Sequence, residues 1–364
     1  MTNVTDATSP VEPRRTAYAA AELRTFAAAL FRHAGLDGDK PDVSAEVLVE
    51  ADLIGHTTHG LALAPRYLQE MGSGSMAVTG DPEIISDRGA CVCWNGRRLP
   101  GVWLTAKAVD LAVERVEKYG TVTIAIGNSH HLGCLAAYLP RATEKGYLAI
   151  VSSSDPSQKT VAPFGSREPV FTPNPVAVGL PTDGDPLLLD TSASITTNNM
   201  GARLVREKGR FPGPWALDAA GRPTDDPTVL TAGGSILPAG GLDHGHKGYA
   251  WALFVEALTQ GLSGFGRADA PQGWGACAFV QVVDPDAFGG RRAFVRQTEW
   301  LARACRDAAP RPGVDRVRVP GDNALARKRL ALAHGVVPHP WVIDALRPAA
   351  ERFGVPMPQV LGEE

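Results

Sequence analysis

Apolar residues recur along the chain with two periods, one typical of helices and one typical of strands. Helical spacing predicts helices over residues 19–35, 43–55, 61–71, 102–119, 134–145, 248–263 and 291–307, followed by two terminal helices. Short apolar runs predict buried strands over residues 122–126, 147–152, 176–180, 187–190, 277–283 and 316–319. This alternation predicts an α/β fold in which helices cover a mainly parallel or mixed sheet.

Two segments depart from the alternation. Residues 83–97 predict a β-hairpin, with residues 90–94 as its second strand and Asn95-Gly96 as a turn signal. Residues 207–244 contain many Gly, Pro and Asp residues and predict a long ordered loop.

The familiar nucleotide-binding motifs are absent from the sequence. Gly72-Ser73-Gly74-Ser75-Met76-Ala77 matches the dinucleotide fingerprint G-x-G-x-x-A, but a predicted helix precedes it where the fingerprint needs a strand. We therefore interpret it as a helix stop and a turn. No G-x-x-x-x-G-K-[ST] motif occurs either. A nucleotide would have to bind on another scaffold.

Composition and charge restrict the class of protein. The 364 residues exceed the size at which single cores stop growing, so we expect two or three packed subdomains. The formal net charge of −3, without a basic stripe, argues against a nucleic acid partner. The longest apolar run, residues 249–255, is much shorter than the ~20 residues of a membrane span. We expect neither nucleic acid nor a membrane as partner.

Cysteine usage favours a reducing compartment. The chain has five cysteines, with one C-x-C and no C-x-x-C, and an odd, sparse set of this kind is typical of cytoplasmic proteins. Residues 1–16 are rich in Thr, Ser, Pro and charge, without a signal-peptide core, and predict a disordered tail.

Polar residues at the ends of predicted elements suggest an anion site and redox chemistry. Lys247-Gly248-Tyr249 follows Gly240-Gly241 and opens a predicted helix, which directs an ammonium and free N–H groups towards a phosphate. His56 and His59 follow a helix, while His130 and His131 follow a buried strand, where ligands often bind. Histidine suits the proton transfer that accompanies reduction of a carbonyl or imine.

Asp190 ends an apolar strand, and three roles stay open for it. It can orient a histidine, receive a ribose hydroxyl or cap the next helix.

A series of motifs runs from about Ala21 to about Phe353. In order they are Asp52-Leu53-x-Gly55-x-x-Thr58-His59-Gly60, Asn128-Ser129-x-His131-x-Gly133, Asn174-Pro175, Leu189-Asp190, Trp215-Ala216-x-Asp218-x-x-Gly221-x-Pro223-Thr224-x-Asp226-Pro227, Leu237-Pro238-x-Gly240-Gly241, Lys247-Gly248-Tyr249 and Val319-Pro320-Gly321. The series resembles the non-Rossmann malate/L-lactate dehydrogenase family. That family includes malate, sulfolactate and ureidoglycolate dehydrogenases, diketogulonate reductase and the piperideine-2-carboxylate/pyrroline-2-carboxylate reductases.

The resemblance implies a non-Rossmann α/β fold, NAD or NADP as cofactor, and a homodimer with sites near the subunit interface. It implies that His59 donates or accepts a proton beside Thr58, and that His131 has a catalytic or substrate-polarising role. In the reaction that we predict, either His59 or His131 moves the proton, while Asp190 sets the geometry. Cofactor contacts are implied for Leu188, Leu189, Asp190, Thr191, Ser192, His246, Lys247, Gly248, Gly321 and Asp322.

The sequence departs from the family at the position that binds the substrate carboxylate. Leu63 stands where many relatives have an arginine, and leucine offers no bidentate clamp. Arg66 and Lys159 are candidate substitutes, and Ser129 and Asn174 complete the expected substrate residues. Thr58 replaces the usual serine and keeps its hydroxyl.

We therefore predict an NAD(P)-dependent oxidoreductase that transfers a hydride between nicotinamide and a small C=O or C=N substrate, such as a 2-oxo acid or cyclic imine. Both NAD and NADP stay open, because the acidic residue that selects NAD in Rossmann proteins has no counterpart here. One alternative is a metal-dependent hydrolase or lyase with His56, His59, His131 and Asp190 as ligands. Another is a family member that binds cofactor without catalysis.

The predicted domain organisation has three parts. Residues 1–16 form the tail. Residues 17–120 and 310–364 form a helical domain for substrate binding and dimerisation. Residues 121–309 form the NAD(P)-binding α/β domain.

Overall fold

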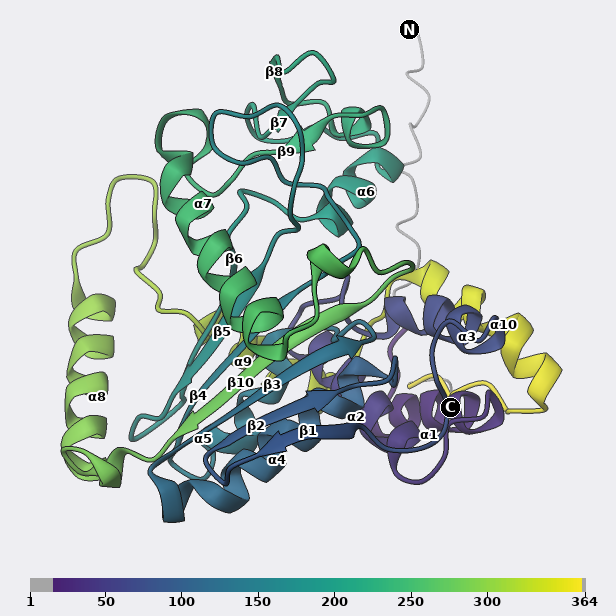
Figure 1. Ribbon diagram of the computed structural model, residues 1–364, viewed down its shortest axis with the longest axis horizontal. Coiled ribbons are helices and arrows are strands. Elements are labelled where there is room, and N and C mark those ends of the chain that lie inside the picture. The colour runs from purple at the N-terminus through teal and green to yellow at the C-terminus, as the bar shows by residue number, and fades with distance from the viewer. Residues whose placement is uncertain (1–15, 362–364) are drawn as a thin grey trace, which may run out of the picture.

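A seven-stranded mixed sheet forms the centre of the molecule (Figure 1). The computed structural model describes residues 16–361, so the predicted tail lies outside the described residues except for Thr16. In spatial order the strands are β1 (Glu83–Asp87), β2 (Cys91–Asn95), β3 (Thr121–Ser129), β10 (Ala276–Val283), β4 (Leu148–Ser154), β5 (Pro175–Leu180) and β6 (Leu187–Ser192).

The α/β prediction with a mixed sheet is confirmed, but the sheet is mainly antiparallel. In this sheet β2 and β3 run parallel, and every other neighbouring pair is antiparallel. The physical reason is the place of β10, which pairs antiparallel with both β3 and β4. The crossover from β3 to β4 still joins two parallel strands, but a strand from much later in the chain separates them.

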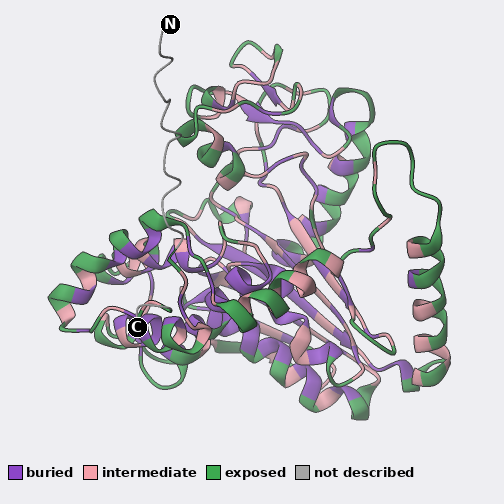
Figure 2. Ribbon diagram, turned by 180° about the vertical axis from the view of Figure 1, so that it is seen from behind, coloured by how far each residue is buried: buried purple, intermediate pink, exposed green. Residues whose placement is uncertain are grey.

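Helices cover both faces of the sheet. Helix α4 (Gly101–Tyr119) lies on one face, against β3 and β10, and shares a buried core with Val122, Ile124 and Val280. The other face is covered by α7 (Gly241–Glu256) and the π-helical turn η4 (Ala257–Gly261). Figure 2 shows that buried residues concentrate in the sheet and in the helix faces that lie against it.

The remaining helices surround this centre (Figure 1). They are α1 (Ala20–His33), α2 (Lys40–Leu53), η1 (Leu61–Leu63), α3 (Ala64–Gly72), η2 (Leu135–Tyr138), α5 (Pro140–Thr143), α6 (Asn198–Arg206), η3 (Pro227–Thr231), η5 (Arg267–Asp269), η6 (Pro285–Ala287), α8 (Arg291–Asp307), α9 (Asp322–His334) and α10 (Pro340–Phe353). Helix α10 contacts α1 and α3. Within residues 16–361, no helix is both long enough and apolar enough to cross a membrane.

Most predicted helices and strands are confirmed, and the hairpin forms, although residues 88–90 join its strands and Asn95-Gly96 follows the second one. Three predictions are wrong in detail, and one helix was not predicted. Residues 316–319 form no strand. The segment predicted as a loop contains a three-stranded sheet of β7 (Ala216–Leu217), β8 (Pro223–Thr224) and β9 (Ser235–Ile236). Helix α6 was not predicted, and α7 begins before Lys247.

The predicted boundary at residue 120 falls inside one continuous sheet. Strands β1 and β2 come before that boundary, and β2 pairs directly with β3 after it. The two predicted segments therefore share a sheet and a hydrophobic core.

The first turn of α4 packs closely against the segment that follows β3. A Cβ on Gly101 would collide with the carbonyl oxygen of His130 and lie 2.7 Å from that of His131. Such distances do not occur for real Cβ atoms, so only glycine allows this approach.

Gly101→Ala should lower the free energy of unfolding by about 1–3 kcal/mol or more, because the backbone of residues 130–131 must move away from α4. Denaturant unfolding measures this change. The matched control is Gly72→Ala at the end of α3, where an added Cβ meets nothing within 4 Å. Equal stability of the two variants would contradict the close packing at Gly101.

Asp52 at the end of α2 holds the loop that follows this helix. Its carboxylate accepts the backbone N–H of Leu61 at 2.9 Å and lies against Gly60. Burial raises the pKa of Asp52 from 3.8 to about 7, and the Leu61 hydrogen bond opposes this shift only in part. Between these two values the folded state binds more protons than the unfolded state, so its stability falls as pH rises.

Asp52→Asn should therefore become progressively more stable relative to wild type as pH rises from about 4 to about 7. The amide keeps an acceptor for Leu61 and carries no charge at any pH. Each unit by which the folded-state pKa of Asp52 exceeds its unfolded-state pKa changes the free energy of unfolding by ~1.4 kcal/mol at most. Denaturant melts at several pH values measure the difference, with Asp42→Asn on the exposed side of the same helix as control. A pH-independent difference for Asp52→Asn would refute this assignment.

Candidate active site

A cavity of about 1070 Å³ opens beside the end of β3. Its wall combines segments that are far apart in the sequence: the loop after α2, the segment after β3, the end of β6, helix α6 and the loop before β10. A second cavity of about 330 Å³ shares Gly55, His56 and Asp190 with the first.

His131 lies on the wall of the large cavity in a defined tautomer. The backbone N–H of Gly133 donates to its Nδ1 at 3.2 Å, and the Tyr67 hydroxyl lies 3.1 Å from the same nitrogen. Because Nδ1 accepts, the proton of the neutral ring must be on Nε2. Nε2 has no hydrogen-bond partner among residues 16–361. Burial, helped by the charges of His59, His130 and Arg66, holds the pKa of His131 well below its usual range.

His59 has the opposite tautomer. The Asn199 amide donates to its Nε2 at 3.3 Å and also reaches the carbonyl oxygen of Thr58, so Nε2 carries the lone pair. Nδ1 then carries the proton and donates to the Thr58 hydroxyl at 3.0 Å. Burial and the charge of His56 lower the pKa of His59 to about 4.

The two histidine rings stack with centroids 5.9 Å apart and an interplanar angle of 22°. Both line the large cavity, and the lowered pKa values leave both neutral at pH 7. One wall therefore presents an N–H donor and a nitrogen lone pair near each other.

Trp274 connects the histidine pair to a cation, and the sequence reasoning missed it. Its ring stacks on His131 at 4.4 Å, and the Arg66 guanidinium lies 3.6 Å from the Trp274 ring centroid. A tryptophan between two glycines, in a loop that leads into a buried strand, was the available signal. Arg66 is half-exposed, and Glu70 lies 3.6 Å from it.

Asp190 lies in β6, between the two cavities. Its carboxylate accepts the backbone N–H of Ala136 at 3.0 Å and the Cys134 thiol at 3.6 Å. Burial raises the pKa of Asp190, while the charge of His56 opposes the shift.

The structure brings several of the expected cofactor residues together. Leu188, Asp190 and Gly321 line the small cavity, and Thr191 and Ser192 line the large one. Leu189 packs against a core of Leu187, Ala302 and Val319. Asp322 makes an ion pair with Arg306 at 2.8 Å and accepts the Val319 N–H.

Lys247 does not open a helix, contrary to the prediction. Helix α7 begins at Gly241, so Lys247 lies inside the helix, where the backbone N–H groups are already bonded. His246 and Lys247 are exposed, and neither lines the two cavities. Gly248 is buried against the backbone of Ala193 and Ala239.

The expected substrate residues separate into two groups. Arg66 and Asn174 line the large cavity, although the Asn174 amide is already bonded to Glu256 at 2.9 Å. Leu63 belongs to the hydrophobic core, Ser129 donates to the carbonyl oxygen of His130, and Lys159 is exposed. None of these three lines either cavity.

The four residues expected as ligands of the alternative metal site form two separate groups. His59 and His131 stack on one part of the wall, whereas His56 and Asp190 form a separate group with Cys134.

The chain matches known proteins along most of its length. The family model described as malate/L-lactate dehydrogenase matches residues 18–347. A malate dehydrogenase of Pyrococcus abyssi is 28% identical over 343 residues, which are 92% of this chain and 94% of the relative. A Δ1-pyrroline-2-carboxylate/Δ1-piperideine-2-carboxylate reductase of Pseudomonas syringae pv. tomato is 31% identical over 317 residues, covering 83% of this chain and 87% of the relative.

Solved structures share the fold. The malate dehydrogenase of Entamoeba histolytica superposes with a TM-score of 0.89 over 94% of this chain and 99% of the other, at 23% identity. The Δ1-piperideine-2-carboxylate reductase of Pseudomonas syringae superposes with a TM-score of 0.81 over 92% and 99%, at 27% identity. The relatives are named dehydrogenases and reductases, which supports an oxidoreductase activity. The chain belongs to the malate/L-lactate dehydrogenase family, as its motifs predicted.

Proposed function

We propose that this protein is an NAD(P)-dependent oxidoreductase that interconverts a small C=O or C=N compound with its alcohol or amine. The observation that carries the proposal is the stacked pair of His59 and His131, whose neutral tautomers present a lone pair and an N–H donor on one cavity wall. A bound nicotinamide would accept or supply the hydride.

The two histidines have different proposed roles at the substrate oxygen or nitrogen. In the oxidation direction, the lone pair on His59 Nε2 takes the proton of the substrate. The substrate then replaces the Asn199 amide, which lies 3.3 Å from this nitrogen. The Nε2–H of His131 donates to the carbonyl or imine as it forms. Gly133 keeps His131 neutral, because a proton on Nδ1 would face the Gly133 N–H. A neutral imidazole donor of this kind polarises a carbonyl without carrying a charge.

Arg66 is the proposed carboxylate clamp. It lines the same cavity as His131 and stacks on the tryptophan that contacts that histidine, whereas Lys159 does not line the cavity. A guanidinium held flat on an aromatic ring keeps its N–H edge free for a carboxylate. The favoured substrates are therefore small 2-oxo or 2-hydroxy acids and cyclic imines that bear a carboxylate.

The two adjoining cavities are the proposed place of the cofactor and the substrate. The small cavity is lined by three residues that the family resemblance assigned to cofactor contact, and one of them, Asp190, also lines the large cavity. NAD and NADP are both candidates. All five cysteines are free, which supports the proposal that the protein works in the cytoplasm.

A homodimer is also proposed. Helix α7 exposes large apolar side chains, with Trp251 58%, Leu253 50% and Phe254 51% accessible. A second copy would cover such a face.

Light scattering should give twice the chain mass for wild type and a smaller mass for Trp251→Glu. A monomeric wild type would contradict the proposal.

The test of the function is a screen of 2-oxo acids, carboxylated cyclic imines and uncharged ketones for consumption of NADH or NADPH. We expect turnover of a carboxylated compound with at least one nucleotide. Absence of turnover with every compound and both nucleotides would contradict the proposed reaction.

His59→Asn should lower kcat by ~10²–10⁴ and leave nucleotide affinity nearly unchanged, because it removes the proton acceptor. In the oxidation direction the rate of wild type should fall as pH drops towards about 4, where His59 becomes protonated. This acid limb should be absent in the variant. Steady-state kinetics over pH, with nucleotide binding measured separately, check both effects.

His131→Asn provides the comparison, since it removes the polarising donor and should cost ~10²–10³ in kcat without removing that limb. Near wild-type rates in either variant would overturn the role given to that histidine.

Arg66→Ala should raise KM for a carboxylated substrate about tenfold or more, since loss of one partner of a charged hydrogen bond costs ~2–5 kcal/mol. Arg66→Lys should recover part of the loss. Lys159→Ala, which removes an exposed cation outside the cavity, is the matched control. Equal KM values for Arg66→Ala and Lys159→Ala would exclude Arg66 as the clamp.

A further inference from the structure

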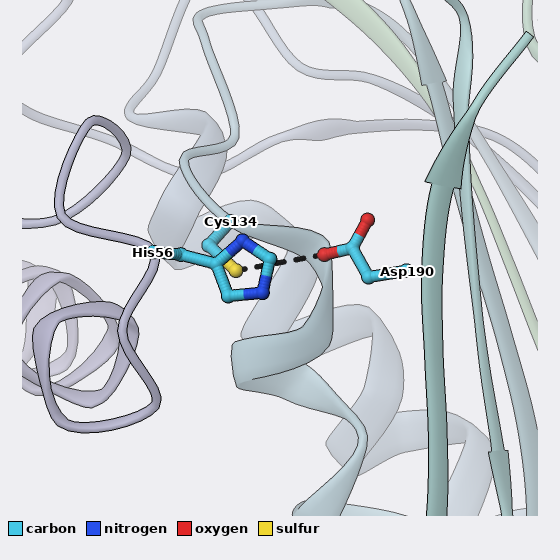
Figure 3. A group of neighbouring side chains, drawn as sticks. All are labelled: His56, Cys134 and Asp190. Carbon is cyan, nitrogen blue, oxygen red and sulfur yellow. Dashed lines mark hydrogen bonds between the residues drawn. The ribbon is translucent and has the colours of Figure 1, made fainter. Parts of the chain in front are cut away.

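Three potential metal ligands converge from separate elements between the two cavities (Figure 3). His56 comes from the loop after α2, Cys134 directly precedes η2, and Asp190 lies in β6. One ligand atom of each residue lies within 4.8 Å of the other two. Figure 3 shows the Cys134 thiol directed towards the Asp190 carboxylate, with the His56 ring beside both.

The surroundings leave these donor atoms available. The Ala136 N–H holds one oxygen of Asp190, and the other oxygen makes no hydrogen bond with the described residues. Neither ring nitrogen of His56 has a hydrogen-bond partner within residues 16–361. His56 is half-buried and lines both cavities, so solvent and ions reach it.

The spacing suits a tetrahedral ion after a small contraction. With metal–ligand bonds of about 2.0–2.3 Å, the ligands of a tetrahedral zinc lie roughly 3.5 Å apart. The observed limit of 4.8 Å therefore requires a movement of about 1 Å, within reach of a rotation of the His56 ring. The charges also balance, because one thiolate and one carboxylate neutralise a divalent cation beside a neutral imidazole.

We propose that His56, Cys134 and Asp190 bind a thiophilic divalent cation, with zinc as the preferred ion and a water from the cavity as fourth ligand. As the sulfur–zinc bond forms, the Cys134 thiol releases its proton to solvent, with no change of oxidation state. Magnesium and calcium are disfavoured, because they prefer oxygen ligands and this cluster offers one carboxylate.

The test first strips metal from the full chain with a chelator and removes the chelator by dialysis. Zinc binding to this chain is then measured without nucleotide or substrate. We expect one zinc per wild-type chain, no magnesium, and at least tenfold weaker zinc binding in His56→Asn and Cys134→Ser. Cys305→Ser, at an exposed cysteine outside the cluster, should bind zinc as wild type does. Cobalt should give a thiolate charge-transfer absorption in wild type and Cys305→Ser and none in Cys134→Ser.

Cys134 is buried, so circular dichroism must show that Cys134→Ser is folded; if it is not, His56→Asn decides the question. Failure of wild type to bind one zinc would overturn the proposal, as would wild-type zinc affinity in His56→Asn. Zinc binding is measured without cofactor, so the outcome is independent of the proposed reaction.

Discussion

The contact between Gly101 and the carbonyl oxygens of His130 and His131 determines how the end of β3 meets the cavity. With helix α4 against these carbonyls, the chain turns at Gly133, which has a φ of +71°. That turn directs the Gly133 N–H at His131 Nδ1, and so the Nε2–H of the ring is left for the cavity. A backbone packing constraint thus selects the tautomer of a side chain.

The rest of the site adds groups that depend on this ring. His59 stacks on His131 and has the complementary tautomer. Trp274 also stacks on His131, and the Arg66 guanidinium lies over the Trp274 ring. Burial keeps both imidazoles neutral, whereas the guanidinium supplies a fixed positive charge close by. The arrangement brings the proposed proton acceptor, the proposed neutral donor and the proposed carboxylate clamp together in one cavity. Asp190 and Cys134 lie together beside His56. Their carboxylate, thiol and imidazole groups are the ligands of the proposed zinc site.

Local patterns predicted those parts of the fold that local physics determines. Long amphipathic helices such as α1 and α8, and strands with fully buried faces such as β3, were predicted close to their observed bounds. Helix α6 was missed because Asn198, Asn199 and Gly201 are weak helix formers, and a cap from Thr197 and tertiary packing stabilise it. Helix α7 starts early because three glycines of its first two turns pack against other segments of the chain.

The site was predicted in part, for a similar reason. His59, His131 and Asp190 stand out as polar residues at the ends of elements, and family motifs contain them. Three features depend on contacts between segments far apart in sequence: the stacking of Trp274 on His131, the presence of Arg66 in the cavity wall, and the absence of Lys159 and Lys247 from it. No periodicity or spacing within one segment contains such information.

The most direct test of the central claim is the tautomeric state of the two histidines, read from nitrogen-15 chemical shifts of histidine-labelled protein near pH 7. Assignment follows from the loss of single resonances in His59→Asn and His131→Asn. We expect His131 to be protonated at Nε2 alone and His59 at Nδ1 alone. A charged imidazolium at His131, or a proton on its Nδ1, would contradict this claim.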